Sequence, residues 1–180
     1  MNVIPTALPE VILLEPKVFA DARGHFFESY NRRTLVEHGI TADFVQDNHS
    51  SSTRGVLRGL HYQIQQPQGK LVRVVAGEVL DVAVDLRRSS PHFGRWASFV
   101  LSAENHRMAF IPAGFAHGFV VRSASAEFLY KTTDYYAPAF ERTLLWNDPE
   151  LAINWELDSE PVLSAKDAIG ATLQTAETFA

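Results

Sequence analysis

The chain has no cysteine, only two methionines and no excess of positive charge. Without cysteine it has no disulfide, no zinc–thiolate site and no thiol nucleophile, and we expect a reducing compartment, the cytoplasm. Lys and Arg number 16 against 21 Asp and Glu, which gives a formal charge of -5. This balance disfavours a general nucleic-acid binder or a protein that binds anionic membranes.

Long hydrophobic runs are also missing. No stretch approaches the roughly 20 apolar residues of a membrane span, and Met1–Glu10 lacks the pattern of a signal peptide. Hydrophobic residues make up 46% of the chain and charged residues 21%, which is typical of a globular protein rather than a disordered or coiled-coil one. We therefore expect one soluble domain over residues 1–180.

Apolar residues recur mostly with a period of two, which indicates β-strands. Leu80–Leu86 alternates, Lys70–Val75 is rich in β-branched residues, and the turn signal Ala76–Glu78 between them predicts a hairpin. Many short strands with frequent turns predict an all-β sandwich or barrel. Further predicted strands are Val11–Phe19, Gly24–Tyr30, Asp43–His49, Val56–Gln63, Trp96–Ser102, Arg107–Ile111, Gly118–Arg122, Glu127–Thr133 and Thr143–Trp146.

Helix signals are few. Asn31 is a good N-cap for a short helix through His38, and Gly39 is a good stop. A second short helix is predicted over Ser164–Ala168. The last ten residues, 171–180, are small and polar, and we expect a loosely packed tail there.

One histidine, His117, lies between two predicted strands in Pro112–Gly118. The spacing Pro-x-Gly-x-x-His resembles the second motif of cupin barrels, although a plain hairpin with a hydrogen-bonded core histidine also fits. Metal-binding cupins carry a first motif, His-x-His followed by Glu, which suits a divalent transition metal. The corresponding stretch here is His61-Tyr62-Gln63 with no early Glu, so we expect no metal.

Cationic residues occur in two of the predicted strands. Arg58 and His61 share one strand, and Lys70 and Arg73 share another. A charge inside a barrel costs several kcal/mol unless it is paired or solvated. These residues therefore indicate either a polar cavity for an anionic ligand or a solvated face.

Nine blocks of residues, taken in order from Asp21 to Asp167, resemble one family, the dTDP-4-dehydrorhamnose 3,5-epimerases. No block is decisive alone, but nine in order are hard to obtain by chance. They are Asp21-x-Arg23-Gly24-x-Phe26-x-Glu28, Gln46-Asp47-Asn48-x-Ser50, Gly55-Val56-Leu57-Arg58-Gly59-Leu60-His61-Tyr62-Gln63, Gln68-Gly69-Lys70-Leu71-Val72-Arg73, Gly77-Glu78-Val79-x-Asp81-Val82-Ala83-Val84-Asp85, Ile111-Pro112-x-Gly114-Phe115-Ala116-His117-Gly118-Phe119, Glu127-Phe128-x-Tyr130-Lys131, Trp146-Asn147-Asp148 and Leu163-Ser164-x-Lys166-Asp167.

The resemblance implies a cupin-like double-stranded β-helix, a jelly-roll barrel, with an N-terminal β extension and a few short helices. It implies a cytoplasmic isomerase that inverts carbons 3 and 5 of dTDP-4-dehydro-6-deoxy-D-glucose and gives dTDP-4-dehydro-L-rhamnose. No metal, cofactor, nucleic acid or membrane is expected. The family is a homodimer that exchanges its N-terminal strands, here residues 1–30.

The resemblance also assigns roles to residues. His61 would be the base, Asp167 its hydrogen-bonded partner, Tyr130 the acid on the opposite face and Lys70 the group that stabilises the oxyanion. The residues expected to bind the substrate are Arg23, Glu28, Gln46, Asn48, Arg58, Asp81, His117 and Tyr136. Arg23 and Glu28 would serve the partner's pocket in the dimer.

Several alternatives stay open on the sequence. The first is a mono-epimerase that inverts only carbon 3 or only carbon 5 of a related sugar. A related ketoisomerase lacks the tyrosine on the opposite face, so Tyr130 argues against it. A non-catalytic cupin that only binds a sugar nucleotide has no use for an acid and a base on opposite faces. A metal cupin, such as a dioxygenase or isomerase, lacks its ligands here.

Overall fold

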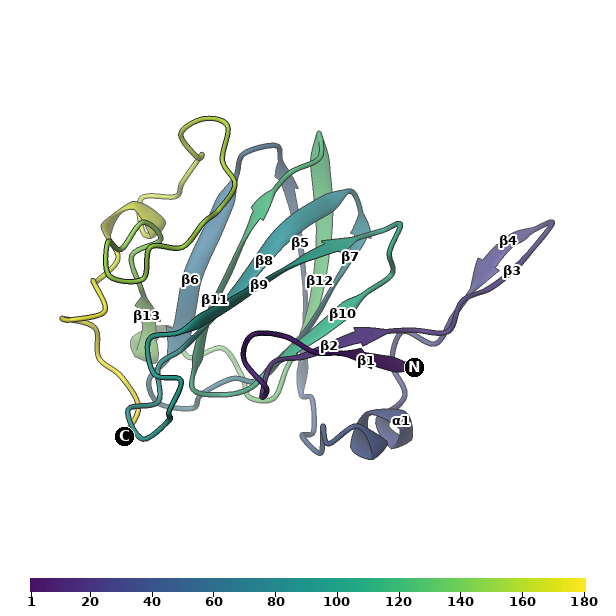
Figure 1. Cartoon of the computed structure of the whole chain (residues 1–180), viewed down its shortest axis with the longest axis horizontal. Helices are drawn as coiled ribbons and strands as arrows, with labels where there is room; N and C mark the ends of the chain where they lie inside the picture. Colours follow the sequence, from purple (N-terminus) through teal and green to yellow (C-terminus); the bar gives the residue numbers. More distant parts are fainter.

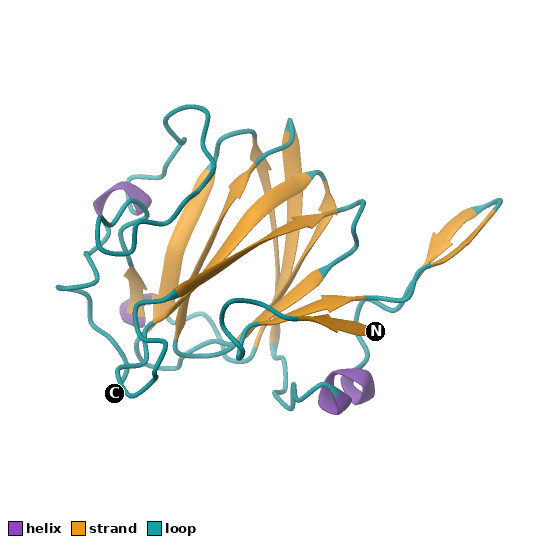
Figure 2. Cartoon of the chain, viewed as in Figure 1, coloured by secondary structure: helices purple, strands orange, loops and turns teal.

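Two antiparallel β-sheets pack face to face and form the body of the molecule (Figure 1, Figure 2). The structure, a computed structural model, describes all residues 1–180. The six-stranded sheet runs in the order β1 (Asn2–Ile4), β2 (Ile12–Glu15), β10 (Met108–Ile111), β7 (Lys70–Ala76), β12 (Ser125–Thr132) and β5 (Gln46–Thr53). The five-stranded sheet runs β13 (Glu141–Thr143), β6 (Leu57–Gln63), β11 (Phe115–Val121), β8 (Glu78–Asp85) and β9 (Trp96–Ser102).

The remaining elements are small. They are the hairpin of β3 (Phe19–Asp21) and β4 (Gly24–Phe26), the helix α1 (Arg32–Glu37), and the short 3-10 helices η1 (Pro138–Phe140) and η2 (Asp167–Ile169). None of the helices has the length and apolar character needed to span a bilayer. The predicted all-β, jelly-roll architecture with few helices is confirmed.

The core between the sheets contains 17 buried hydrophobic residues. Within it the rings of Phe119 and Phe128 stack with their centroids 4.2 Å apart, and each ring comes from a different sheet. A second core of 14 residues covers the outer face of the five-stranded sheet, where Trp155 and Leu173 pack. Because both faces of this sheet are covered, β8 is buried almost throughout.

The predicted hairpin around Ala76–Glu78 is wrong. β7 pairs with β10 and β12, whereas β8 pairs with β11 and β9, so the chain passes from one sheet to the other at Gly77. Gly77 has φ +77°, and a Cβ there would lie 2.0 Å from the carbonyl oxygen of Ser125. Only glycine fits this corner. A period-two pattern fixes which face a side chain takes and leaves the pairing partner open.

The tail 171–180 is packed, contrary to the prediction. Leu173 and Ala176 are buried in the second core, and the Phe179 N–H donates to Leu86 O at 3.0 Å. The apolar residues at 173, 176 and 179 recur every three positions and lie against the five-stranded sheet. For predicting whether this segment is packed, the spacing of its apolar residues was therefore a better guide than its polar composition.

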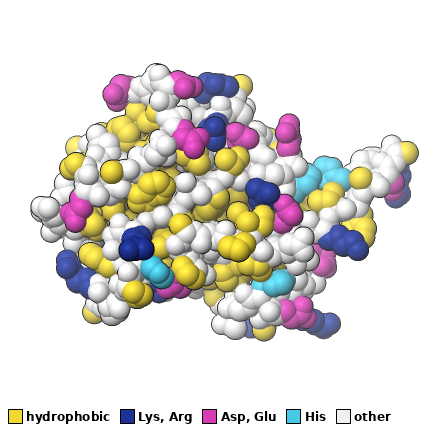
Figure 3. Space-filling view, in the orientation of Figure 1, with side chains coloured by type: hydrophobic (Ala, Val, Ile, Leu, Met, Phe, Trp, Pro, Cys, Tyr) yellow, Lys and Arg dark blue, Asp and Glu magenta, His cyan; other side chains and the backbone are white.

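Near the N-terminus the predicted strand Val11–Phe19 divides into β2 and β3. Pro16, which has no N–H for a ladder, follows the end of β2. The β3–β4 hairpin then projects from the body (Figure 1). Histidine side chains, cyan in Figure 3, gather where it leaves the body, and the His25 and His106 rings lie 4.6 Å apart. The predicted helix is confirmed, with the Asn31 side chain accepting from Arg33 N and Thr34 N.

Candidate active site

A cavity of about 260 Å³ opens between the two sheets and is lined by residues from both. His61 and His117 reach it from the five-stranded sheet, and Lys70 and Tyr130 reach it from the six-stranded sheet. Arg58 and Tyr136 also line it. Six of the predicted site residues therefore meet at one cavity, although they come from four strands and a loop.

An irregularity in β6 places two of these side chains together. Across the β6–β11 ladder, His117 faces His61 and Phe119 faces Arg58, so β6 has one residue more than β11 between these pairs. In a regular strand, positions three apart point to opposite faces. The extra residue, at the glycine-containing step Gly59–Leu60, turns both Arg58 and His61 toward the cavity.

His61 is held by a carboxylate 106 residues away in the sequence. Its Nε2 lies 2.5 Å from Asp167 Oδ1, and the Ser164 hydroxyl donates to Asp167 Oδ2 at 2.8 Å. Burial acts to raise the pKa of Asp167, but the hydrogen bonds from His61 and Ser164 outweigh it and hold that pKa below its ordinary value. An ionised carboxylate fixes the ring with its proton on Nε2 and leaves Nδ1, which has no protein partner, free to accept a proton.

Lys70 is a buried cation whose strand belongs to the sheet opposite His61 and whose side chain reaches across to the His61 backbone. Its side chain is nearly inaccessible, and Nζ donates to the His61 carbonyl at 3.1 Å. Burial lowers the pKa of Lys70 to about 8, while the nearby Asp81 carboxylate acts to raise it. At pH 7 the ammonium is charged, poorly hydrated and able to stabilise negative charge that develops in the cavity.

Asp81 and His117 form a buried pair beneath the cavity. His117 Nε2 lies 2.9 Å from each carboxylate oxygen of Asp81. Burial raises the pKa of Asp81, although His117 and Lys70 act to lower it. Asp81 is fully buried and lies behind His117, so it meets the cavity through that ring and not directly.

The two tyrosines of the site differ in exposure. Tyr130 is partly buried on β12, where burial raises the pKa of its phenol and the Arg58 charge acts to lower it. Tyr136 lies at the mouth and is 54% exposed. Its hydroxyl donates to Glu141 Oε2 at 3.1 Å.

The other predicted binding residues lie outside the cavity. Gln46 Oε1 accepts from Tyr136 N at 3.1 Å, and Gln46 Nε2 donates to Asn48 Oδ1, so both residues flank the mouth. Arg23 belongs to the turn of the projecting hairpin, where it pairs with Asp21 at 2.6 Å. Glu28 follows the hairpin and accepts from Asn31. Within one chain the structure does not bring Arg23 and Glu28 to the cavity.

Sequence reasoning missed some residues of the cavity wall. Lys166 and Glu141 line it and form an ion pair at 2.8 Å. Lys166 is part of the Leu163–Asp167 block, directly before Asp167, and that position was a usable signal. Glu141 had no such signal in the sequence, because it lies in none of the family's blocks and reaches the site only through the pairing of β13 with β6.

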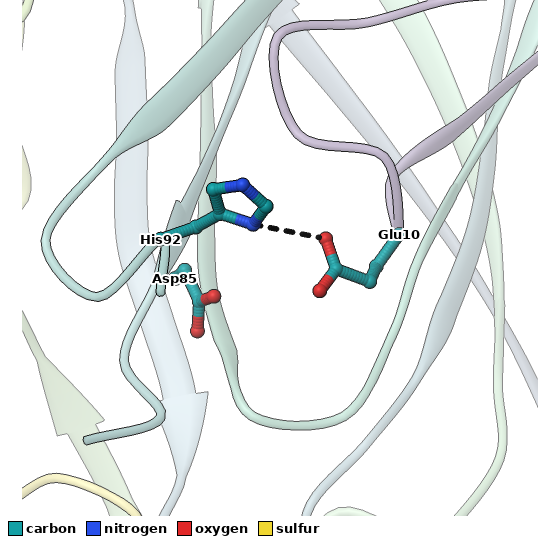
Figure 4. Close-up of side chains that lie close together, drawn as sticks. All are labelled: Glu10, Asp85 and His92. Carbon is teal, nitrogen blue, oxygen red and sulfur yellow. Dashed lines mark ion pairs between the residues drawn. The ribbon is translucent and has the colours of Figure 1, made fainter. Parts of the chain in front are cut away.

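The donor set does not fit the metal of the metal-binding cupins. His61 Nε2 is taken by Asp167, and the amide of Gln63 is bonded to backbone groups. A separate group, Glu10, Asp85 and His92, brings ligand atoms within 4.8 Å of one another (Figure 4). There the Arg87 guanidinium lies 2.9 Å from Glu10 and 2.7 Å from Asp85. These carboxylates already have a cation, so the group acts as an ion-pair network.

Comparison with known proteins places this site in a family. The family model described as dTDP-4-dehydrorhamnose 3,5-epimerase matches residues 5–175. The chain belongs to this family. It is 62% identical, over 180 residues and 99% of each chain, to the dTDP-4-dehydrorhamnose 3,5-epimerase of Pseudomonas aeruginosa. The prediction of a carbohydrate epimerase, an isomerase, is confirmed.

Two solved structures extend the comparison. A Legionella pneumophila dTDP-6-deoxy-D-glucose-3,5-epimerase in complex with dTDP-4-keto-L-rhamnose has a TM-score of 0.95 and 54% identity, over 98% of this chain and 94% of that one. A 3'-monoepimerase from Streptomyces bikiniensis in complex with dTDP-quinovose has a TM-score of 0.88 and 35% identity, over 95% and 87%. The solved structures similar to this chain thus include a single epimerase as well as a double one.

Proposed function

We propose that this epimerase inverts carbons 3 and 5 of dTDP-4-dehydro-6-deoxy-D-glucose, with His61 as the base, Tyr130 as the acid and Lys70 as the oxyanion partner. The observation that carries the proposal is the arrangement of the walls. A histidine with a free Nδ1 comes from one sheet, and a tyrosine and an ammonium come from the other. Inversion requires a proton to leave one face of a carbon and another to arrive at the opposite face.

The first step is removal of a hydrogen α to the 4-ketone. The proton passes from carbon 3 or carbon 5 to His61 Nδ1, and the electron pair moves into an enolate whose charge rests on the ketone oxygen. Asp167 stabilises the imidazolium that forms, and the buried Lys70 Nζ stabilises the oxygen. Tyr130 then donates its hydroxyl proton to the carbon from the other face, and the enolate returns to the ketone. The tyrosinate takes a proton from water, and the His61 imidazolium gives its proton to the hydroxide that remains, which restores both groups.

The size of the cavity fits a sugar ring rather than a whole nucleotide sugar. Its volume of about 260 Å³ is below the roughly 300 Å³ at which pockets for drug-sized ligands begin. The nucleotide would therefore lie along the mouth, where Tyr136 and Arg58 are available. Arg58 suits a pyrophosphate because its planar fork can bind two oxygens.

Homodimerisation accounts for the projecting hairpin and is part of the proposal. A two-stranded hairpin is marginally stable alone, and Phe19 and Phe26 on this one are 54% and 67% exposed. Such a segment is suited to another surface. Arg23 and Glu28 would then reach the partner's cavity. The cytoplasmic location stays a prediction from the sequence.

The proposed reaction is tested by incubating the protein with dTDP-4-dehydro-6-deoxyglucose in deuterated water. Deuterium at both carbons 3 and 5, followed by NMR, is the expected result, and label at one carbon alone would make the protein a mono-epimerase. His61→Ala should abolish the exchange while binding stays measurable. Tyr130→Phe should still exchange but should not invert. A wild type that binds the substrate but exchanges no deuterium would refute the proposed acid–base mechanism.

The dimer is tested by complementation between two inactive variants, Arg23→Ala and His61→Ala. If Arg23 serves the partner's cavity, an equal mixture after subunit exchange forms heterodimers with one intact site. About a quarter of the wild-type activity should return for a two-fold dimer. No recovery despite verified heterodimers would show that Arg23 serves its own chain or none.

A further inference from the structure

The residue at the position of a cupin metal ligand, Gln63, lines the cavity, but its side-chain amide is bonded to the backbone of nearby loops. Its side chain is buried, and it makes three hydrogen bonds to backbone groups. Nε2 donates to Gln66 O at 2.7 Å and to Tyr135 O at 3.2 Å. Oε1 accepts from Ala137 N at 2.8 Å.

Two of these bonds flank Tyr136 in the sequence. Gln63 holds the carbonyl of the residue before it and the N–H of the residue after it, while the Tyr136 ring is left half exposed at the mouth. Two other glutamines hold the same loop. Gln46 accepts from Tyr136 N, and Gln68 Nε2 donates to Asp134 O at 2.8 Å.

The loop between β12 and η1 therefore depends on side-chain amides for its shape, because it has no ladder of its own. A buried amide with all its partners in place fixes those backbone groups in one arrangement. A loop without such bonds samples several arrangements and must be ordered when a ligand binds.

We propose that Gln63 is a positioning residue for the substrate, one that acts through the loop it holds and sets where Tyr136 stands at the mouth. This inference rests on the proposed function, because it concerns affinity for that substrate. Gln63 takes no part in proton transfer. Its loss should weaken binding and leave the chemical step intact.

The test replaces Gln63 with Leu, which keeps the approximate size and removes all three hydrogen bonds. The KM should rise about tenfold, since the loop then has to be ordered on binding, and kcat should stay within about twofold. The matched control is Gln65→Leu, two residues away, whose exposed side chain makes no hydrogen bond. It should keep the wild-type KM.

A double-mutant cycle separates positioning from a general loss of packing. Tyr136→Ala should raise KM by itself but add little to Gln63→Leu, because both changes remove the same contact. If the two effects on KM simply multiply, or if kcat falls as much as KM rises, the inference is wrong. If Gln63→Leu does not fold, Gln63→Asn, which cannot reach the loop, takes its place with the same expected KM change.

These outcomes are distinct from failure of the proposed function. A wild type that binds substrate without exchange or turnover contradicts the reaction itself. A wild type that turns over normally, beside a Gln63→Leu variant with unchanged KM, contradicts only the role of Gln63.

Discussion

Replacing Lys70 by Met should make the protein more stable and much less active. Burial lowers the pKa of this lysine from 10.5 to about 8. At about 1.4 kcal/mol per pKa unit, the charged side chain costs the folded state about 3 kcal/mol near pH 7. Methionine has a similar length and no charge to desolvate.

Part of that gain is offset. The variant loses the hydrogen bond from Nζ to the His61 carbonyl, for which we allow about 1 kcal/mol. The attraction between Lys70 and Asp81 is already contained in the lysine's pKa of about 8 and is not deducted again. The expected net gain in unfolding free energy is about 2 kcal/mol at pH 7. The value of kcat/KM should fall about 100-fold or more, as when one oxyanion donor is removed.

The pH dependence follows from the direction of the shift. Between pH 8 and 10.5 the unfolded chain binds more protons at Lys70 than the folded chain does, so the wild type gains stability relative to the variant as pH rises. The advantage of Lys70→Met should therefore be full below pH 8 and vanish near pH 10, and above about pH 10.5 the wild type should be the more stable by about the 1 kcal/mol of the hydrogen bond.

Urea unfolding at matched protein concentration, at pH 7 and pH 10, measures both effects. Lys131→Met is the control, because Lys131 is a more exposed lysine paired with Asp47 on the neighbouring strand. Its stability should change by less than about 0.5 kcal/mol. A Lys70→Met variant that is less stable than the wild type at pH 7, or one with undiminished turnover, would refute the reasoning.

Three further substitutions test other parts of the structure. Asp148→Ala leaves the backbone N–H groups of Glu150, Leu151 and Leu173 without their acceptor, and urea unfolding should show a loss of about 3 kcal/mol; a neutral result would contradict the role of Asp148 as an anchor. Gly118→Ala puts a Cβ 2.6 Å from Arg58 O, so we expect the free energy of unfolding to fall by about 1–3 kcal/mol and the turnover to fall with it. Unchanged turnover would show that β6 tolerates displacement. Ser164→Ala removes a hydrogen bond that holds the pKa of Asp167 low, and because the stability from that carboxylate is lost as pH falls, acid unfolding should begin at a higher pH than in the wild type. An identical midpoint of acid unfolding would contradict this role of Ser164.

The period-two pattern and the turn residues were sufficient to predict the fold class, because each strand must present an apolar face to a core. They could not predict pairing. Lys70–Val75 and Leu80–Leu86 are separated by a good turn signal, yet Gly77 makes a corner between sheets. Turn residues predict that the chain reverses or bends, but they do not predict which strand the next strand pairs with.

The site was less accessible to the sequence than the fold. His61 and Asp167 are 106 residues apart, and only the resemblance paired them before the structure did. Strand periodicity would have put Arg58 and His61 on opposite faces, and the extra residue in β6 reverses that. Glu141 has no local signal, because a three-residue strand at a sheet edge brings it to the cavity.

The failed hairpin prediction and the chemistry of the cavity are connected. Because the chain changes sheets at Gly77, β7 with Lys70 lies in the sheet of Tyr130, and β8 lies beside β11 and His117. A hairpin would have put β7 in the same sheet as His61 and His117, and β12, which carries Tyr130, would have lost β7 as its neighbour in the opposite sheet. Epimerisation needs a proton taken from one face and returned to the other, and two sheets with a cavity between them supply two faces. The crossover at Gly77 is thus a condition for the proposed mechanism as well as for the barrel.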